Sequence, residues 1–415
     1  MIRRSEGAGA EPPGRFDPVR IALAGLLRCH EPPIPESLAR LVNGLGPVDA
    51  WSAIAHGTAP ADVSTPIAPR LAGLDPAELN RRAIDDLHRA RAAGAELIGP
   101  DDQDWPADTF AGLASLVPYD GCRTAAPPLA LYRRGGRWPT DAGRAVSVVG
   151  SRSATAYGQR VATELGAGLA TEGFTVVSGA AFGVDVAAHR GALYAGDQPG
   201  APLPAGGVTV AVLACGIDRS YPVAHRALLD AAAACGSVVS EYPPGAVPAR
   251  HRFLVRNRLI AALAAATVVV EAGRRSGSLN TATSAGSLGR QVLAVPGPVG
   301  SAMSVGCHDL IRDRRAELVT GARDVIGLVG PLRPAEPVHR PGDRATDGLD
   351  LVTSRVHEAL PARGGAAVDE VAAEAGLPVP DVLGALAELE MRDLAARSVG
   401  TWRRSGASPD PACRA

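Results

Sequence analysis

The sequence predicts an α/β fold built on a mostly parallel, doubly wound sheet. From Ala145 onward six short, β-branched runs alternate with Ala- and Leu-rich stretches of helical spacing, with Gly, Ser or Pro soon after each run. Parallel strands that are buried on both faces have this composition, and helices usually connect them. The predicted strands are Ala145–Val149, Phe174–Val177, Val208–Leu213, Val238–Ser240, Thr267–Glu271 and Gln291–Val295.

The length of 415 residues predicts further domains beside this sheet. Residues 16–95 have apolar residues at helical spacing and form a small helical domain, and residues 349–404 read as three short helices and a β-hairpin wing. Residues 96–329 form the core with an N-terminal extension, in which Pro127–Tyr132 is an edge strand. We expect a Pro-rich linker at 330–348 and disordered tails at 1–15 and 405–415.

The composition excludes several classes of protein. All 42 basic residues are Arg, so a catalytic lysine and a lysine-containing phosphate loop are absent. The six Cys form no C-x-x-C pair, which predicts no metal site and no disulfide framework. The longest apolar run, Leu259–Val270, is too short to span a bilayer, and we expect a cytoplasmic protein without membrane contact.

Turns rich in Gly, Ser and Arg follow the predicted strands. In a doubly wound sheet these turns meet at one edge, where exposed backbone N–H groups and Arg side chains bind anions. Four Arg lie within residues 250–258, and residues 144–325 hold 17 basic against 12 acidic residues in a chain of net charge −1. Localised positive charge beside phosphate-binding turns indicates a polyanion, of which nucleic acid is the commonest.

The residues at the same edge of the sheet do not form a convincing catalytic site. No turn reads G-x-G-x-x-G with an acidic residue about 20 positions later, which argues against a dinucleotide cofactor. Asp185 and His189 have the spacing of an acid–base pair, but Asp185 also stands where a helix N-cap belongs. Glu271 is another candidate base, yet the following helix, Asn280 to Arg290, contains no second carboxylate. We therefore expect neither catalysis nor a cofactor.

Several of these segments resemble the signature of a known family. They are Gly150-Ser151-Arg152, Val177–Asp185, Ser240–Gly245, Phe253–Ile260, Ser276–Leu279 and Ala294–Gly297. In this order, over about 145–313, they resemble the DNA-processing protein A family (DprA, also called Smf). The resemblance implies a Rossmann-like core that binds single-stranded DNA as a homodimer without catalysis. It also implies protection of incoming DNA and loading of the RecA recombinase during natural transformation in competent cells.

The resemblance also implies the DNA-binding residues. They are Ser151, Arg152, Tyr157, Ser178, Gly179, Phe182, Gly183, Arg256, Asn257, Arg258, Ser276, Gly277, Ser278 and Thr281. Phe182 stands where many relatives have a basic residue, so it would either stack on an unpaired base, at about 1–3 kcal/mol, or lie in the core. Replacing Arg256 and Arg258 together by Ala is expected to leave the fold intact and weaken DNA binding.

Outside the core the resemblance is weaker or departs from expectation. The N-terminal helices are only loosely similar to the family's small helical (SAM-like) domain. Residues 349–404 resemble its winged-helix domain, but the recognition helix, Pro380 to Met391, has Asp381, Glu388 and Glu390 and no Arg. Such a helix would repel phosphates, so we expect it to contact protein.

Two other functions remain open at this point. The first is a nucleotide-binding enzyme that resembles the phosphoribohydrolases of the same superfamily. Their P-G-G-x-G-T-x-x-E turn is replaced here by Ser276–Thr281, and no Glu follows. The second is a regulator that binds a nucleotide in the core and signals through the winged helix.

Overall fold

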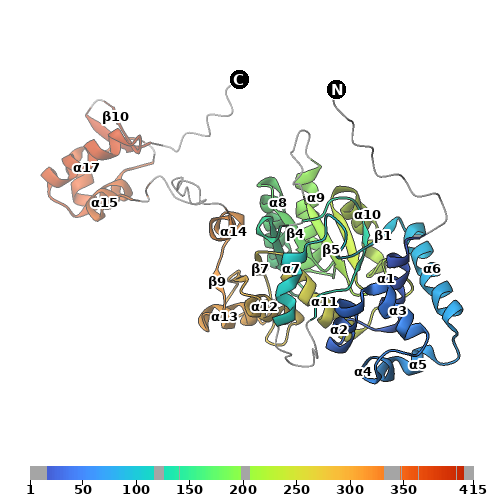
Figure 1. Ribbon diagram of the computed structural model, residues 1–415. Helices are drawn as coiled ribbons and strands as arrows, with labels where there is room; N and C mark the ends of the chain where they lie inside the picture. The colour runs from blue at the N-terminus through green and yellow to red at the C-terminus, as the bar shows by residue number, and fades with distance from the viewer. Residues whose placement is uncertain are drawn as a thin grey trace, which may run out of the picture. The chain divides into compact units, whose positions relative to one another are not determined.

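The computed structural model describes residues 16–115, 126–139, 141–197, 206–330, 346, 348–362, 364–398 and 400–405. The chain forms two compact units, Met1–Leu332 and Arg333–Ala415, whose elements are labelled in Figure 1. The predicted tail at 1–15, nearly all of the predicted linker at 330–348 and nearly all of the tail at 405–415 lie outside the described residues.

A single sheet forms the centre of the first unit, with nine strands among its described residues in the order β1-β2-β6-β5-β4-β3-β7-β8-β9. The strands from β6 to β9 pair in parallel, whereas β1 and β2 are antiparallel, which confirms the mostly parallel sheet. The strands are β1 (Ala95–Ile98), β2 (Leu131–Arg134), β3 (Ala145–Val149), β4 (Thr175–Ser178), β5 (Thr209–Leu213), β6 (Ser237–Ser240), β7 (Ala266–Val269), β8 (Gln291–Ala294) and β9 (Glu317–Leu318).

The prediction of an edge strand at Pro127–Tyr132 was wrong. The strand begins at Leu131 and lies between two neighbours, because Tyr132 pairs with Leu97 of β1 on one side and with Ser240 of β6 on the other. The true edges are β1 and β9, which the sequence did not reveal. β9 contains two residues, too few for strand periodicity to emerge.

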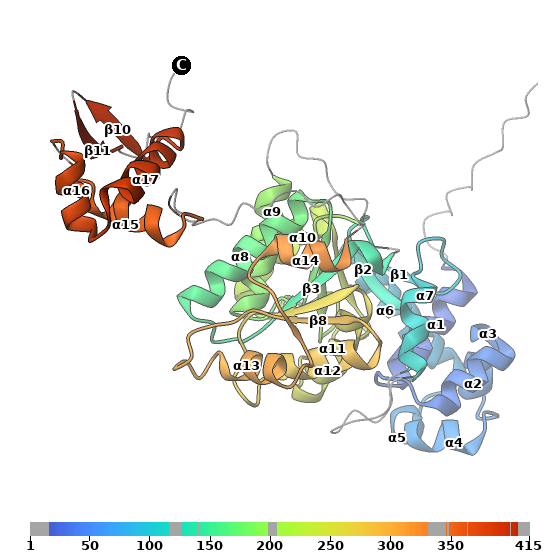
Figure 2. The same cartoon turned by 90° about the vertical axis from the view of Figure 1, so that its left-hand side faces the viewer.

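Helices cover both faces of the sheet, as Figure 2 shows. One face carries α8 (Ala156–Thr171), α9 (Val184–Gly196), α10 (Arg226–Cys235) and α14 (Ala322–Val329), and the other carries α7 (Ala107–Ala111), α11 (Arg250–Ala262), α12 (Gly277–Ser287) and α13 (Val305–Arg312). Short 3-10 turns are η2 (Gly112–Ser115), η3 (Ala142–Arg144) and η4 (Val223–His225). Residues of β3 alternate between the two cores, since Val146 and Val148 pack with α8 while Ala145 and Val149 face α11.

The strand order reverses between β3 and β7. From β3 the chain moves to β4, β5 and β6 in one direction, whereas β7 pairs with the opposite side of β3. The helices that follow these two strands, α8 and α12, therefore lie on opposite faces. A crevice opens between such diverging connections, outside the carboxyl ends of the strands, and is the usual ligand site of this architecture.

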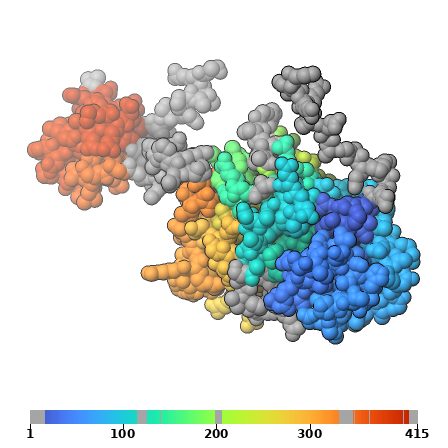
Figure 3. All heavy atoms as spheres, in the orientation of Figure 1, coloured from blue at the N-terminus to red at the C-terminus, as the bar shows by residue number. Residues whose placement is uncertain are grey.

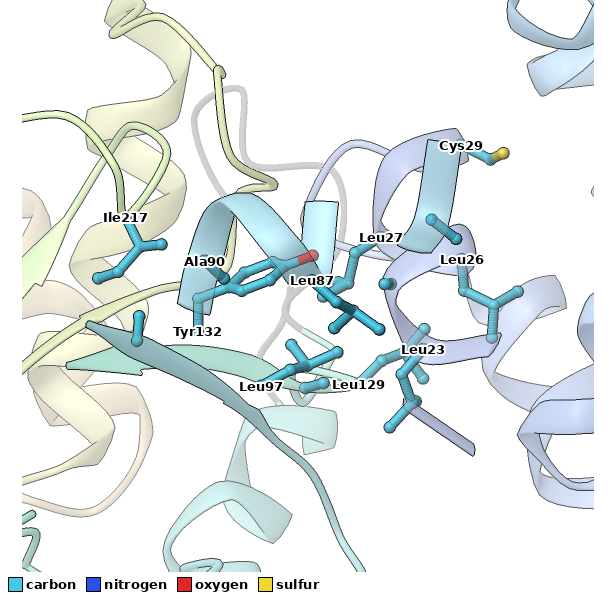
Figure 4. Close-up of a cluster of buried hydrophobic side chains, with 14 of the residues drawn as sticks. Leu23, Leu26, Leu27, Cys29, Leu87, Ala90, Leu97, Leu129, Tyr132 and Ile217 are labelled. Atoms are coloured by element: carbon cyan, nitrogen blue, oxygen red, sulfur yellow. The ribbon is translucent and has the colours of Figure 1, made fainter. Parts of the chain in front are cut away.

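The N-terminal helices pack on the β1–β2 end of the sheet. They are α1 (Pro18–Cys29), α2 (Glu36–Leu45), α3 (Pro47–Ala55), α4 (Ala61–Ser64), η1 (Thr65–Ile67), α5 (Ala68–Leu71) and α6 (Pro76–Ala92). They share one hydrophobic cluster with the sheet, in which Tyr132 of β2 lies between Ile217 on one side and Leu27 and Leu87 on the other (Figure 4). In Figure 3 the blue surface of these helices adjoins, without a gap, the cyan surface of the residues that follow α6.

The second unit has its own small core, and its three helices and its hairpin wing confirm the prediction. It contains α15 (Leu351–Ala359), α16 (Val368–Ala375), α17 (Val379–Met391) and the hairpin of β10 (Ala395–Ser398) and β11 (Thr401–Arg404). Val371, Leu386 and Trp402 are buried together. Gly376 ends α16 at φ 64°, a left-handed conformation that favours glycine.

Candidate nucleic-acid interface

A cavity of about 640 Å³ lies where the strand order reverses. Its walls are the turns after β3, β4 and β7 together with the first half of α11, and we call it the switch-point cavity. It brings together eight of the predicted DNA-binding residues, namely Ser151, Arg152, Arg256, Asn257, Ser276, Gly277, Ser278 and Thr281. Segments more than 100 residues apart in the sequence therefore form one site.

The lining of the switch-point cavity is strongly basic. Four guanidinium groups face it, and the one carboxylate among the described lining residues is that of Asp185. The four are Arg152, Arg250, Arg256 and Arg275. Such an excess of positive charge in a concave site attracts and holds an anion.

Arg256 is a buried arginine among the lining residues. It is only 4 % exposed, and its Nη1 donates to the Val212 carbonyl over 2.6 Å. Its Nε is buried and has no hydrogen-bond partner among the described residues. Burial lowers the pKa of Arg256 and the charge of Asp185 opposes this shift, but a guanidinium stays protonated at neutral pH. Arg256 therefore contributes a positive charge to the cavity.

Two predicted glycines shape the site. A Cβ on Gly179 would stand 1.9 Å from Nη1 of Arg256, so the absence of a side chain gives the guanidinium its room. Gly183 has φ +78°, and a Cβ there would stand 2.2 Å from the Ser151 carbonyl oxygen. Both positions allow the turn after β4 to approach its neighbours closely.

The first turn of α12 supplies the backbone side of the cavity. Ser276 is the N-cap, and its Oγ accepts from the Ser278 N–H over 3.4 Å. Nδ2 of Asn257 donates to the Gly277 carbonyl over 3.3 Å and so ties α11 to this turn. The start of an 11-residue helix presents a partial positive charge, which suits a phosphate.

Aromatic rings lie at the mouth of the cavity. Phe253 and Tyr221 line it with ring centroids 5.6 Å apart, and the Arg152 guanidinium lies 4.6 Å from the Phe253 centroid. Phe182 is 51 % exposed and packs edge-on against His225, so it does not lie in the core, although it is not part of the lining. Sequence reasoning left out Tyr221 and Phe253, although both occur in the Arg-containing segments that pointed to the site.

Three other predicted residues lie outside the lining and have their own partners. The Tyr157 hydroxyl donates to the Pro296 carbonyl over 2.6 Å, and Ser178 Oγ donates to the Val148 carbonyl over 2.6 Å. Arg258 is 2 % exposed and donates twice, over 2.8 Å each, to the buried carboxylate of Glu241. These side chains hold the protein together.

The candidate acid and base groups also serve the fold. The N-cap of α9 is Gly183, so the expected capping role of Asp185 was wrong; its carboxylate instead accepts from the Ala181 N–H over 3.3 Å. His189 is fully buried, with Nδ1 2.6 Å from Thr209 Oγ1, and burial and Arg256 lower its pKa to about 3. Glu271 is 1 % exposed and accepts from both the N–H and the hydroxyl of Thr155.

The second unit presents a different surface. On α17, Asp381 and Glu390 are exposed beside apolar side chains, of which Leu383 is 50 % and Met391 81 % exposed. An acidic and apolar helix face of this kind does not suit a phosphate backbone. Among the described residues of the whole chain, no helix combines the length and the apolar character needed to cross a membrane.

These features define a Rossmann-like protein that carries a winged-helix domain. The family model described as DNA recombination-mediator protein A matches residues 96–330, and the model described as DprA winged helix domain matches 340–401. The chain therefore belongs to the DNA recombination-mediator protein A family.

Named relatives agree with this assignment. A Mycobacterium tuberculosis protein that bears the name DprA is 47% identical over 402 residues, which cover 94% of this chain and 96% of that protein. The DNA processing protein DprA of Streptococcus pneumoniae is 36% identical over 247 residues, which cover 59% of this chain and 78% of that protein. The X-ray structure of the Streptococcus pneumoniae protein superimposes with a TM-score of 0.54 at 29% identity and covers 76% of this chain and 98% of that one.

Proposed function

We propose that this protein binds single-stranded DNA in the switch-point cavity and acts as a mediator of recombination. The observation that carries this proposal is the excess of positive charge in the cavity lining, where Arg152, Arg250, Arg256 and Arg275 stand against one carboxylate among the described lining residues, that of Asp185. The start of α12 adds backbone N–H groups. A phosphate group would accept from these donors and neutralise the excess charge.

The surroundings of the cavity favour a single strand over a duplex. Tyr221, at the mouth, and Phe182, on the turn after β4, are 41 % and 51 % exposed, and unpaired bases stack on such rings at about 1–3 kcal/mol each. A duplex keeps its bases stacked on one another and offers no free face.

The remaining parts of the proposal rest on the family. In this role the protein would act in the cytoplasm as a homodimer, without catalysis, and would load the RecA recombinase onto DNA taken up in natural transformation. The partners of Asp185, His189 and Glu271 described above support a non-enzymatic role, because each group already serves the fold. The exposed face of α17 suits a protein partner better than DNA.

The first experiment is fluorescence anisotropy of a labelled oligonucleotide, single- and double-stranded, titrated with the protein over a salt series. We expect a clear preference for the single strand. We also expect log K to fall linearly with log salt, by roughly 0.7 for each phosphate that the protein contacts. Binding that is absent, or equal for both forms and lost at modest salt, would overturn the proposal and favour a mononucleotide ligand.

A matched pair of variants tests the site. Arg152→Ala removes an exposed guanidinium from the lining, which lies over the Phe253 ring. Arg160→Ala removes an exposed arginine of α8 that pairs with Glu164 and lies near the Tyr157 ring, outside the lining. We expect Arg152→Ala to weaken single-strand binding about tenfold, which corresponds to roughly 1.4 kcal/mol of binding free energy. Arg160→Ala should weaken it by less than about twofold. Equal effects would remove the cavity from the binding site.

A further inference from the structure

A second basic cavity lies beside the first, between the N-terminal helices and the turn after β6. It has a volume of about 340 Å³, and we call it the N-terminal cavity. Four arginines from four helices line it: Arg28 of α1, Arg70 of α5, Arg89 of α6 and Arg252 of α11. None of them belongs to the site predicted from the sequence.

The positive charge of the N-terminal cavity is only partly neutralised. Glu31 accepts from Arg252 over 2.6 Å and from Arg70 over 3.3 Å. Behind the wall, the buried carboxylate of Asp86 pairs with Arg28. Two carboxylates thus face four guanidinium groups, which leaves about two positive charges without a partner.

Hydrogen-bond donors remain free in this cavity as well. Among the described residues, no acceptor contacts the guanidinium of Arg89, Nη1 of Arg28 or Nη2 of Arg252. Arg89 extends toward the turn after β6, with Nη1 3.5 Å from where a Cβ of Gly245 would stand. A phosphate oxygen is the acceptor that suits several converging guanidinium groups.

The side chains that line the N-terminal cavity suit the phosphate backbone of DNA better than its bases. The one aromatic residue among the described lining residues is Tyr242, which is 1 % exposed and lies under the guanidinium of Arg252, 5.1 Å from its ring centroid. An unpaired base therefore finds no ring face to stack on. The cavity suits phosphate groups and not bases.

The first half of α11 connects the two cavities. Arg250 and Phe253 line the switch-point cavity, while Arg252, between them in the sequence, lines the N-terminal cavity. A strand that leaves one cavity over the start of α11 therefore meets the other. A continuous basic track of this kind is typical of single-strand binding.

We propose that the N-terminal cavity binds the phosphodiester backbone of the same single strand beyond the part held in the switch-point cavity. This inference rests on the proposed function and extends it, because it makes the N-terminal helices part of the DNA-binding surface. It predicts that affinity rises with the length of the strand, and that this gain depends on Arg89.

The test uses Arg89→Glu, because Arg28 and Arg252 hold buried or half-buried carboxylates and their loss would disturb the fold. The matched control is Arg81→Glu, an exposed arginine two turns earlier on α6 that pairs with Glu78 outside the cavity. Both variants change the net charge equally. Each is titrated by anisotropy with oligothymidylates of about 5 and about 20 nucleotides, which lie near the lower end and above the upper end of the roughly 4–16 nucleotides that one OB fold covers.

We expect Arg89→Glu to weaken binding of the longer strand about tenfold and to reduce its salt slope by about 1, while the shorter strand binds as before. Arg81→Glu should change neither by more than about twofold. If Arg89→Glu acts like Arg81→Glu, or weakens both lengths equally, the N-terminal cavity is not an extension of the site. If the unchanged protein binds neither length, the proposed function itself fails, so the two failures are distinguishable.

Discussion

The two sides of α11 differ in what their arginines contact. On one side Arg258 is enclosed and donates to both oxygens of Glu241. On the other side Arg256, two residues earlier, donates to the Val212 carbonyl and lines the switch-point cavity without a salt bridge to a described carboxylate. A run of basic residues in a sequence therefore does not identify a binding site by itself, because burial and ion pairing decide which of the charges can contact a ligand.

The largest effect is expected from Arg258→Ala. This change leaves the carboxylate of Glu241, 1 % exposed, without its partner, and the loss of one member of a buried ion pair costs about 3–5 kcal/mol. The free energy of unfolding, from urea titration, measures it. Arg250→Ala, at the exposed start of the same helix, should cost less than about 0.5 kcal/mol.

The double replacement of Arg256 and Arg258 is thus a poor test of DNA binding, contrary to the expectation from the sequence. A stable Arg258→Ala variant that has lost DNA affinity would reverse the comparison and assign Arg258 to the site.

The burial of His189 has a consequence for acid stability. Burial first, and then the charges of Arg256 and His225, lower the pKa of His189 to about 3, below its ordinary value of 6.5. Between about pH 6.5 and pH 3, His189 therefore binds a proton in the unfolded chain but not in the folded chain. The contribution of neutral His189 to the free energy of unfolding is fully present above about pH 6.5. It falls by about 1.4 kcal/mol per pH unit as the pH drops toward 3.

His189→Leu should remove this loss and shift the acid midpoint of unfolding, followed by circular dichroism, to lower pH. Thr209 keeps a partner in this variant, because its hydroxyl also donates to the Val176 carbonyl. His56→Leu, at an exposed position, is the control. An unchanged midpoint in His189→Leu would mean that His189 is protonated in the folded protein.

A smaller effect is expected from Gly179→Ala, which tests the cavity side of α11 without changing any charge. Gly179→Ala places a methyl group where the Arg256 guanidinium now stands, and the flexible end of that side chain must move. We expect single-strand affinity to fall about tenfold, roughly 1.4 kcal/mol. The free energy of unfolding should fall by about 1 kcal/mol, because the hydrogen bond from Arg256 to the Val212 carbonyl is disturbed. Gly286→Ala, whose Cβ would lie 3.8 Å from Val292 away from the cavity, should leave affinity unchanged. Unchanged affinity in Gly179→Ala would remove Arg256 from the site.

The smallest effect is expected from the winged-helix unit. Neutralising the exposed carboxylates of α17 by Asp381→Asn and Glu390→Gln together should alter single-strand affinity by less than about twofold, because screened surface charges that do not contact a ligand contribute little. Anisotropy in the same salt series measures it. A severalfold gain in affinity would place α17 close to the bound DNA and contradict its assignment to a protein partner.

Much of the core could be predicted from the sequence. The six strands were located within two residues of their ends, because buried β-branched runs between helices leave few alternatives. The edge β9 was missed because two residues carry no period, and β1 was missed although it has as many residues as β4 and β6. The Gly and Ser turns were found because strand ends in a parallel sheet share one edge.

The assignment of individual side chains could not be predicted in the same way. Ser178, Tyr157 and Arg258 stand in the same segments as the lining residues but turn toward backbone carbonyls or a carboxylate. Their partners come from other parts of the chain, and no local pattern marks them. Tyr221 and Phe253 were passed over for the same reason, because only the fold brings them together.

The sequence by itself determined the doubly wound sheet, the winged-helix unit and the basic edge of the core, because apolar periodicity and turn chemistry are local properties. Only the tertiary structure decided which charges are free. It enclosed Arg258 with Glu241, left Arg256 open to a cavity, and gathered Arg28, Arg70, Arg89 and Arg252 around a second one. The physical reason is that desolvation and pairing depend on residues distant in sequence, which meet only when the chain has folded.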